Sequence, residues 1–358
     1  MAHISGTFAI DAPASALNNA GAEPGATTDN TVAVKYIRTG AGERFPYVSA
    51  QAFRYWLRTT IERNGIAPGP TAPVFREQKV AYTDANPLLY WDDDLLGYMR
   101  APSRKASAKE ARKADASRER ETVTEETLTR ASPFRVSTLV SIAPVNIVDD
   151  FGVMSRHDGD PVPHEHQFYR TTLKGLFSLD LSSVGTFTYR NKTGYKNLDE
   201  VRMEQAVERG LEHLEEEKAY RLPASERASR VAALFAGFAR IEGGAKQSIH
   251  YTDVAPSVTV TAVTRGGNNP FVHVIGADAR GRPSIRPDAL TQALSVAADD
   301  LLSPVYVGWA TGYLDAQREE MAQGLREAGL QYTLDHPRRA LERLADDVGG
   351  QSGRQWLE

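Results

Sequence analysis

The sequence predicts an α+β fold built on an antiparallel sheet that carries large insertions. The expected elements run strand, helix, insertion, strand, loop, strand, helix and strand, an order that suits this class. The order is compatible with a ferredoxin-like core, although many α+β folds share it. The 358 residues suffice for one large domain or two smaller ones. With 41% hydrophobic and 25% charged residues, the composition excludes collagen-like, coiled-coil and wholly disordered proteins.

The first helix has the clearest pattern in the chain. Ser49 is its expected N-cap. Before the helix, strands are expected at 4–10 and 31–38, separated by a loop rich in alanine, glycine and asparagine at 11–30. Helical spacing predicts one buried stripe, formed by Phe53, Trp56, Leu57, Thr60 and Ile61. The residues expected on a different face are Gln51, Arg54, Tyr55, Arg58 and Glu62.

The remaining elements alternate between strands and helices. Residues 100–130 are highly charged and predict an exposed helical or partly disordered insertion. The segment 149–167 is polar and predicts a long loop or hairpin, and 168–189 is β-like with bends at Gly175 and Gly185. Strands are further expected at 134–148, 258–263 and 271–275, and helices at 198–218, 224–241, 286–302, 315–328 and 337–348.

The chain contains no cysteine, which excludes disulfides, thiolate zinc sites, iron–sulfur clusters and cysteine nucleophiles. No apolar stretch approaches the roughly 20 residues that span a bilayer. The first ten residues lack the basic start and long apolar core of a signal peptide. We therefore expect a soluble, cytoplasmic protein with no membrane partner.

Three histidines, His157, His164 and His166, lie among acidic residues in the polar segment 149–167. Imidazole and carboxylate groups are suitable metal ligands. Their spacing matches no helical ligand motif, however, and Gly159, Pro161 and Pro163 interrupt the segment, whereas a metal site needs rigid support. A solvated polar loop is the favoured interpretation, and we expect no metal.

Two acidic features allow a catalytic interpretation as well. The run Asp92–Asp94 is more typical of a helix cap or a solvated turn than of a two-metal site. Asp29, in the first loop, could serve as a lone general acid or metal ligand, but no partner is visible and a structural role is favoured. Phosphate-loop, dinucleotide and GxSxG motifs are absent.

A basic group near the N-terminus is the more coherent candidate. Six Lys and Arg residues between Val32 and Asn64 outnumber two Glu residues, for a net charge of +4. Arg54 and Arg58 are four residues apart and near the helix N-terminus, where backbone N–H groups favour anions. Nearby Tyr47 and Tyr55 could stack on bases. A solvated amphipathic helix remains an open alternative.

Ordered sequence blocks carry a family resemblance from about residue 4 to 265. They read ISGTFAIDAPASALNNAG, NTVAVKYI, FPYVSAQAFRYWLR, YWDDDLLGYM, SPFRVSTLVSIAPV, LKGLFSLDLSSVGTF and GAKQSIHYTDVAPS. In this order they resemble the CRISPR Cascade backbone subunit, the seventh CRISPR-associated (Cas) protein family, in its DevR-like type I-B form. The final hundred residues match only loosely.

The resemblance implies an RNA-recognition-motif (RRM) core elaborated into a palm, fingers and a thumb. The palm would comprise 1–67 and 136–358, with the thumb hairpin inserted at about 146–169, and 68–135 would form the fingers. Several copies would form a helical filament along the guide RNA (crRNA). Pairing of the guide with target DNA would supply sequence specificity, as in other guide-RNA effectors.

The resemblance also implies site residues. Matched RNA-binding positions are Ser49, Gln51, Arg54 and Arg58 on the helix, Asn18 and Asn19 before it, and Lys246 and Gln247 in the GAKQ segment. Lys35 and Arg38 of the basic group complete the predicted RNA-binding set. Thumb or neighbour contacts are expected from Asn146, Met154, His157, His164 and His166.

The expected function is therefore a non-catalytic, crRNA-binding backbone subunit without a cofactor. Its expected partners are crRNA, further copies of itself, other Cascade subunits and, through the guide, target DNA. The alternative is a metal-dependent target-RNA nuclease subunit that uses Asp29 or the His157, His164 and His166 loop, because related type III subunits cut from an acidic first-loop residue. A protein-binding assembly scaffold is a third possibility.

The net charge of −4 argues against bulk coating of nucleic acid, but its distribution is uneven. Asp199–Glu217 carries −6 and Ile285–Glu358 carries −5, which leaves +7 for the rest of the chain. The matched RNA-binding blocks lie in that basic remainder. The charge pattern predicts two polarised surfaces, of which the basic one can follow a phosphate backbone.

Overall fold

The centre of the molecule is a long strand, β1 (Ala2–Ser15), with a partner on each side. The computed structural model describes residues 1–21, 31–77, 80–103, 110, 115–156 and 158–358. β1 pairs antiparallel with β13 (Val162–Asp180) and with β17 (Val258–Arg265). The prediction of an α+β fold around an antiparallel sheet is confirmed.

The main sheet extends outward from these three strands. Its order is β21-β20-β17-β1-β13-β11-β5-β4. The outer strands are β20 (Val305–Trp309) and β21 (Tyr332–Asp335) on one side, and β11 (Leu139–Ser141), β5 (Arg44–Val48) and β4 (Tyr36–Arg38) on the other. β20 and β21 pair in parallel, whereas the other neighbours along this path are antiparallel.

Two glycines in the central pair of strands make room for phenylalanine rings. Gly6 lies opposite Phe177, and Phe8 lies opposite Gly175. A Cβ atom at Gly175 would come within 2.3 Å of the Phe8 ring. The expected bend at Gly175 is therefore wrong, because the glycine sits within a continuous strand and is required by close packing. Gly185 does lie in a turn, with a φ of +65°.

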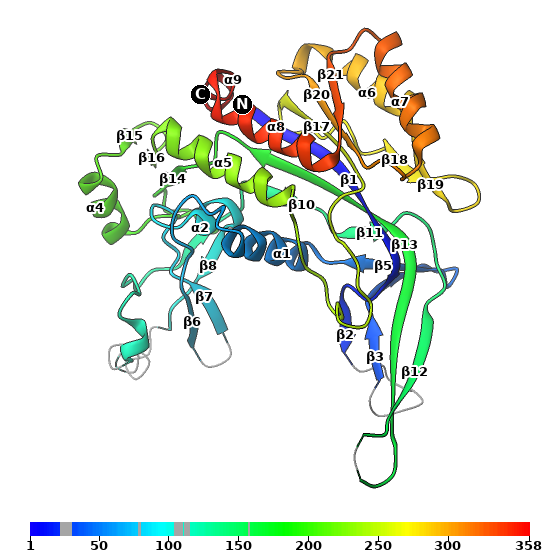
Figure 1. Cartoon of the computed structure of the whole chain (residues 1–358). Helices are drawn as coiled ribbons and strands as arrows, with labels where there is room; N and C mark the ends of the chain where they lie inside the picture. The colour runs from blue at the N-terminus through cyan, green and yellow to red at the C-terminus, as the bar shows by residue number, and fades with distance from the viewer. Residues whose placement is uncertain (22–30, 78–79, 104–109, 111–114, 157) are drawn as a thin grey trace.

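Helices α1 (Ala50–Arg63) and α5 (Ala224–Phe238) cover one face of the sheet (Figure 1). The predicted stripe of α1 is buried, and the Ser49 side chain accepts a hydrogen bond from the backbone N–H of Ala52. The rings of Phe53 and Phe238 meet edge to face 5.4 Å apart and belong to the largest hydrophobic core. Helices α8 (Pro337–Gly349) and α9 (Gln351–Leu357) contribute further side chains to this core.

The opposite face at β17 and β20 has a second core. Helices α6 (Pro287–Val296) and α7 (Asp315–Glu327) cover it, beside the pair β18 (Ile275–Ala277) and β19 (Pro283–Ile285). A strand was expected at 271–275, but most of this segment is a turn that leads into β18. The expected helix at 286–302 ends at Val296 and is followed by a 3₁₀ turn, η2 (Ala298–Asp300).

The region 68–135 consists of short elements around buried charged groups. These are β6 (Val74–Glu77), β7 (Val80–Thr83), α2 (Trp91–Leu96), β8 (Tyr98–Arg100), the 3₁₀ turn η1 (Ala116–Arg118), β9 (Leu128–Arg130) and β10 (Phe134–Val136). Arg100 is buried, and its Nη2 donates to Glu121 at 2.6 Å. Glu121 pairs with Arg100 of β8 and with Arg118 of η1. The described part of the charged segment 100–130 that contains η1 is therefore held against a strand by ion pairs and is not fully exposed.

A small satellite unit lies at the far end of α5 in Figure 1. It comprises β14 (Thr186–Thr188), α4 (Glu200–Glu208), β15 (Glu212–Leu214) and β16 (Ala219–Arg221) around its own hydrophobic cluster. The predicted helix at 198–218 is wrong beyond Glu208. Gly210, with a φ of +65°, ends the helix, and the chain turns into β15.

A long hairpin projects from the sheet (Figure 1). It is formed by β12 (Val148–Met154) and the first part of β13, which pair antiparallel from Val148 opposite Phe168 to Met154 opposite Val162. β2 (Asn19–Gly21) and β3 (Thr31–Val34) lie at its root, and β3 pairs with β13. In the described ranges, no helix is long and apolar enough to cross a membrane.

Candidate nucleic-acid interface

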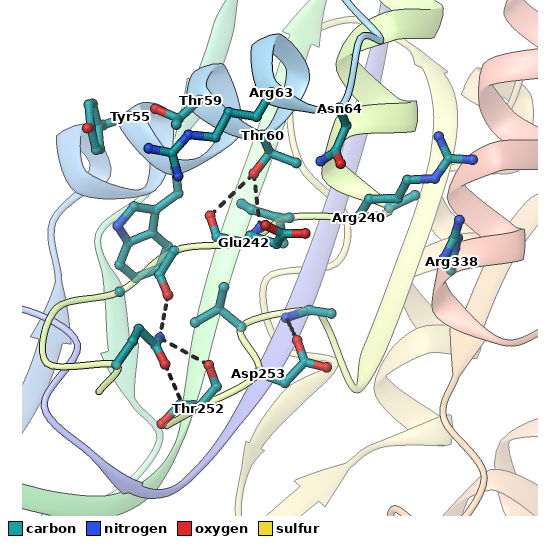
Figure 2. A pocket seen from close by; sticks show the side chains of 18 of the residues that line it. Tyr55, Thr59, Thr60, Arg63, Asn64, Arg240, Glu242, Thr252, Asp253 and Arg338 are labelled. Atoms are coloured by element: carbon teal, nitrogen blue, oxygen red, sulfur yellow. Dashed lines mark hydrogen bonds between the residues drawn. The ribbon is translucent and has the colours of Figure 1, made fainter. Parts of the chain in front are cut away.

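A groove of about 940 Å³ lies between α1, the segment 239–255 and the start of α8 (Figure 2). One wall of the groove is the exposed side of α1. Tyr55, Thr59 and Arg63 are spaced four residues apart, so they lie in a line along the helix. The Tyr55 ring is 63% exposed. Arg63 is exposed in the last turn and, among the described residues, has no ion-pair partner, so its charge faces the groove unneutralised.

The opposite wall is fixed to α1 by reciprocal hydrogen bonds. The backbone N–H of Glu242 donates to Thr60 Oγ1 at 3.0 Å, and Thr60 Oγ1 donates to the Glu242 carbonyl at 3.3 Å. Gly243 then passes directly over Trp56, where a Cβ atom would come within 2.3 Å of the indole. The glycine is needed for this close approach, which holds the wall in place.

The loop that follows is braced from within by one side chain. Gln247 donates to the carbonyls of Gly243 and Thr252, and its Oε1 accepts the backbone N–H of Thr252 at 2.9 Å. Tyr251 lies next to this brace and is 79% exposed. The groove therefore carries two exposed tyrosines, Tyr55 on α1 and Tyr251 beside the braced loop. Exposed aromatic faces of this kind can stack on nucleic-acid bases.

The third side of the groove has a more balanced charge. Arg240 and Arg338 both bind the carboxylate of Glu342, at 2.7 and 3.1 Å. Figure 2 shows Arg240 and Arg338 at the end of the groove nearest α8. Asp253 also lines it and accepts the backbone N–H of Ala255. The groove thus combines exposed aromatic surface with charges of both signs, since Glu242 and Asp253 line it together with the arginines. Its exposed rings are the feature that suits single-stranded nucleic acid.

Backbone hydrogen bonds bring together two of the predicted RNA-binding groups that are far apart in the sequence. The N–H of Ala245, beside Lys246 and Gln247, donates to the Leu17 carbonyl at 3.0 Å. The N–H of Lys35 donates to the Asn18 carbonyl at 3.1 Å. Asn19 follows on β2. These bonds place the segments around 18, 35 and 246 next to one another. Asn18 Nδ2 is buried and has no hydrogen-bond partner among the described residues, and the Gln247 side chain is occupied in bracing its own loop.

The other predicted residues before and at the start of α1 have separate positions. Arg38 is exposed on β4, directly opposite Arg44. The Ser49 hydroxyl is occupied as the N-cap of α1. Gln51 is exposed in the first helical turn and is available to a partner.

Arg54 and Arg58 lie on the side of α1 that meets α2. Arg54 donates to the Leu96 carbonyl, and burial lowers the pKa of its guanidinium. Arg58 Nε lies 2.7 Å from Asp92 Oδ2, and its Nη2 donates to the Ala72 carbonyl at 3.0 Å. Both guanidinium groups thus join α1 to α2. An RNA contact from either residue stays a prediction.

The acidic run Asp92–Asp94 is buried in the first turn of α2, so the interpretation as a solvated turn is wrong. Its charge is neutralised from three directions: Asp92 binds Arg58, and Asp94 binds both Arg130 and Arg230. Asp93 instead accepts the backbone N–H of Asn86 at 2.8 Å. Burial, and secondarily the neighbouring Asp92, raises the pKa of Asp93 to about 7.

The predicted thumb residues that fall within the described ranges lie on the projecting hairpin or at its root. Asn146 is exposed at its root, where it lines a second hollow together with Arg44. Met154 is exposed at the far end of β12. The hairpin's exposed apolar residues are between 43 and 61% accessible, and they are Val148, Phe151, Val153, Met154 and Val162. Exposed apolar surface of this kind on a narrow ribbon is typical of a protein–protein interaction site.

Of the three histidines weighed as metal ligands, two fall within the described residues. His164 and His166 lie on the same face of β13 with parallel rings 6.2 Å apart, but His157 lies outside the described residues. His166 instead contacts Asp150 at 3.0 Å and lies next to His250. Asp29, the alternative catalytic residue, also lies outside the described residues.

Sequence reasoning missed Tyr251 and gave Arg63 no individual role, although both line the groove. A usable signal existed for Tyr251, because an aromatic residue follows the matched GAKQ segment within a short polar loop. No local signal links that loop to α1, since the contact between Glu242 and Thr60 spans 182 positions.

The fold is similar to chains of solved CRISPR complexes. One, described as a CRISPR RNA-guided surveillance complex, pre-nicking, aligns with a TM-score of 0.53 at 11% identity, covering 96% of this chain and 99% of that chain. Another, described as a CRISPR RNA-guided surveillance complex, aligns with a TM-score of 0.50 at 12% identity over 97% and 99%. No family model matches the sequence. No curated protein matches it.

Proposed function

We propose that this chain is a crRNA-binding backbone subunit of a type I, I-B-like CRISPR surveillance complex. The main support is the likeness of fold to chains described as parts of CRISPR RNA-guided surveillance complexes, which extends over nearly the whole length of both chains. A shared fold alone does not specify function, so the proposal also depends on the surface described above. The family blocks in the sequence point to the same class of protein, in its DevR-like form.

The topology of the central strands supports an RRM-type palm. The strands β1, β11, β13 and β17 lie in the spatial order β17-β1-β13-β11. Helix α1 precedes β11 and α5 precedes β17, which gives a βαββαβ sequence with strand order 4-1-3-2. This is the ferredoxin-like arrangement to which the RRM belongs. The elements in 68–135 would then be the fingers.

The guide would lie along the surface formed by Asn18, Lys35 and Lys246 and continue toward the groove of Tyr55 and Tyr251. Cations and backbone N–H groups would hold its phosphates, and 2′-OH contacts would distinguish RNA from DNA. Binding through the backbone leaves the bases available to pair with target DNA, so sequence specificity would come from the guide. The protein itself would be non-catalytic.

The hairpin β12–β13 would act as the thumb and contact a neighbouring copy along the guide. Two-stranded ribbons are only marginally stable in isolation, and exposed apolar side chains on them favour burial against another surface. Repetition of this contact would build a helical filament. Other Cascade subunits would bind its ends and flank.

A salt titration with matched variants tests the RNA surface. Lys35→Ala with Lys246→Ala should weaken binding to a guide RNA in fluorescence anisotropy and lower the slope of log K against log salt by about one to two, because two phosphate contacts are lost. Arg326→Ala, an exposed arginine on α7 away from this surface, is the control and should leave the slope unchanged. Equal slopes in all three proteins would contradict the proposed surface.

The nuclease alternative is tested with the same assembled complex. Labelled target RNA is incubated with Mg²⁺ or Mn²⁺, and the proposal expects intact RNA. Cleavage that disappears in Asp29→Ala would replace the non-catalytic assignment with the metal-dependent one. A filament that survives complete digestion of its RNA would instead favour the protein scaffold.

A further inference from the structure

Three potential metal ligands converge at the root of the projecting hairpin. Asp150 lies on β12, His166 on β13 and His250 in the loop after Lys246. One ligand atom from each lies within 4.8 Å of the other two. His166 and His250 are 84 positions apart in the sequence, so only the fold brings them together.

The strand register explains why Asp150 and His166 meet. The two residues are directly opposite each other across β12 and β13, so both side chains lie on the same face of the hairpin. His166 Nε2 lies 3.0 Å from Asp150 Oδ2, and the His166 side chain is only 11% exposed. Gly152 is the next residue on that face, opposite His164, and a Cβ there would come within 2.5 Å of the His164 ring.

His250 completes the group from the body of the protein. Its backbone N–H donates to the Lys246 carbonyl at 2.8 Å, which fixes the turn that carries it. Its ring lies 4.9 Å from the His166 ring and stacks on Phe168 at the same distance. Within the described part of the chain, the buried His250 Nε2 has no hydrogen-bond partner.

The unpartnered Nε2 of His250 suits coordination. A metal ion requires a nitrogen lone pair, and no hydrogen bond within the described residues occupies this nitrogen. A buried polar nitrogen without a partner is otherwise unfavourable, and a bound ion would remove that cost.

We propose that Asp150, His166 and His250 bind a divalent transition-metal ion of the zinc class, which fixes the hairpin to the body of the protein. Two imidazoles and one carboxylate form a ligand set suited to such ions. Ligand bonds of about 2.0–2.2 Å place the ligand atoms of a tetrahedral site roughly 3.4 Å apart, so modest side-chain rotation closes the site. A water molecule completes the coordination.

The metal site does not depend on the proposed guide binding. The function of the site is to fix the position of the hairpin relative to the body of the protein. Without the ion, ring contacts with His166 and Phe168 link His250 to the hairpin. With the ion, the 246–250 turn, β12 and β13 are joined by coordinate bonds. The orientation of the hairpin relative to the surface at Lys246 would then be fixed before any neighbour binds.

Metal content and spectroscopy test the site directly. The tag-free, metal-stripped chain is titrated with Zn²⁺ by calorimetry and with Co²⁺ by visible absorption. We expect one ion per chain and the intense visible bands of tetrahedral Co²⁺. Asp150→Asn and His250→Gln should each weaken the affinity at least about tenfold, since even outer-shell changes have effects of that size. His164→Gln is the matched control and should bind as the unaltered chain does.

A second readout follows the hairpin itself. Saturating Zn²⁺ should slow amide hydrogen exchange in 148–154 and 162–168 of the unaltered chain and of His164→Gln, but not of His250→Gln. Circular dichroism confirms that each variant is folded, and His250→Gln is the decisive one because it alters a loop residue outside the sheet. Binding of less than one ion to the folded chain, or equal Zn²⁺ affinity in His250→Gln, would overturn the proposal.

Discussion

The Arg58 guanidinium and the Asp92 carboxylate form an ion pair in which Nε lies 2.7 Å from Oδ2. The side chain of Arg58 is 24% exposed and that of Asp92 only 3%. The pair connects the helix that carries the predicted RNA-binding residues to the region 68–135. A charge that the sequence assigns to a phosphate therefore has a structural partner within the chain.

Arg58→Ala should destabilise the protein, because it leaves the buried Asp92 without its cation. The expected loss in the free energy of unfolding is about 3 kcal/mol, measured by urea denaturation. Arg58→Ala combined with Asp92→Asn should recover part of this loss, since the uncompensated charge is removed. If Arg58→Ala alone were as stable as the unaltered chain, the ion pair would not contribute to stability. That result would favour a purely RNA-binding role for Arg58.

The buried acidic run predicts a pH dependence of stability. The pKa of Asp93 is raised to about 7 in the folded chain from 3.8. Between these values the folded state retains a proton that the unfolded state has released, so this residue makes stability fall as the pH rises through about 7. Asp93→Asn should therefore gain stability relative to the unaltered chain on going from pH 5 to pH 8.

Urea midpoints at the two pH values measure this difference. The exposed Asp346→Asn on α8 is the control, and the difference between it and the unaltered chain should stay constant. A constant difference for Asp93→Asn as well would show that Asp93 is ionised throughout the range.

The pattern of α1 is an example of what the sequence could predict. Its five buried positions and its N-cap follow from helical spacing and from the chemistry of Ser49, both of which are local. The charge state of Asp92–Asp94 could not be predicted in the same way. Three consecutive carboxylates in a sequence suggest a solvent-exposed segment. The arginines that neutralise Asp94 lie 36 and 136 positions away in the sequence.

The same limit applies to the candidate sites. Separate sequence blocks predict the residues around Asn18, Lys35 and Lys246 individually. Their contact depends on the order of the strands in the folded sheet, which no single block contains. The pairing of His166 with His250 depends on it too. The bend expected at Gly175 was wrong because a glycine in a strand can mark either a turn or a close contact, and only the position of Phe8 distinguishes them.

The hairpin's exposed apolar face should matter for assembly rather than for folding. Phe151→Ser should change the free energy of unfolding by no more than about 0.5 kcal/mol, as for most surface substitutions. Filament formation on guide RNA should weaken at least tenfold, since burial of a Phe contributes about 1.5–3 kcal/mol. Val296→Ser, at an even more exposed apolar position at the end of α6, is the control.

Analytical ultracentrifugation with and without guide RNA measures this assembly. If Phe151→Ser and Val296→Ser assembled equally well, the hairpin would not be the neighbour contact.

The two groove tyrosines should contribute stacking energy to RNA binding. Tyr55→Ala and Tyr251→Ala should each weaken the affinity for single-stranded RNA by about 1–3 kcal/mol without changing the salt slope, because no charge is lost. Tyr195→Ala, an exposed tyrosine in the turn before α4, should have no effect. Unchanged affinity in both groove variants would place the RNA elsewhere on the molecule.

The dependence of copy number on guide length tests the central claim most directly. Native mass spectrometry of the purified chain, mixed with a series of guide RNAs of increasing spacer length, counts the copies bound to each RNA. A backbone subunit predicts that copies are added one at a time at a regular increment of spacer length, and that Phe151→Ser reduces this stepwise addition. A single copy on every guide, or no binding to RNA, would contradict the account.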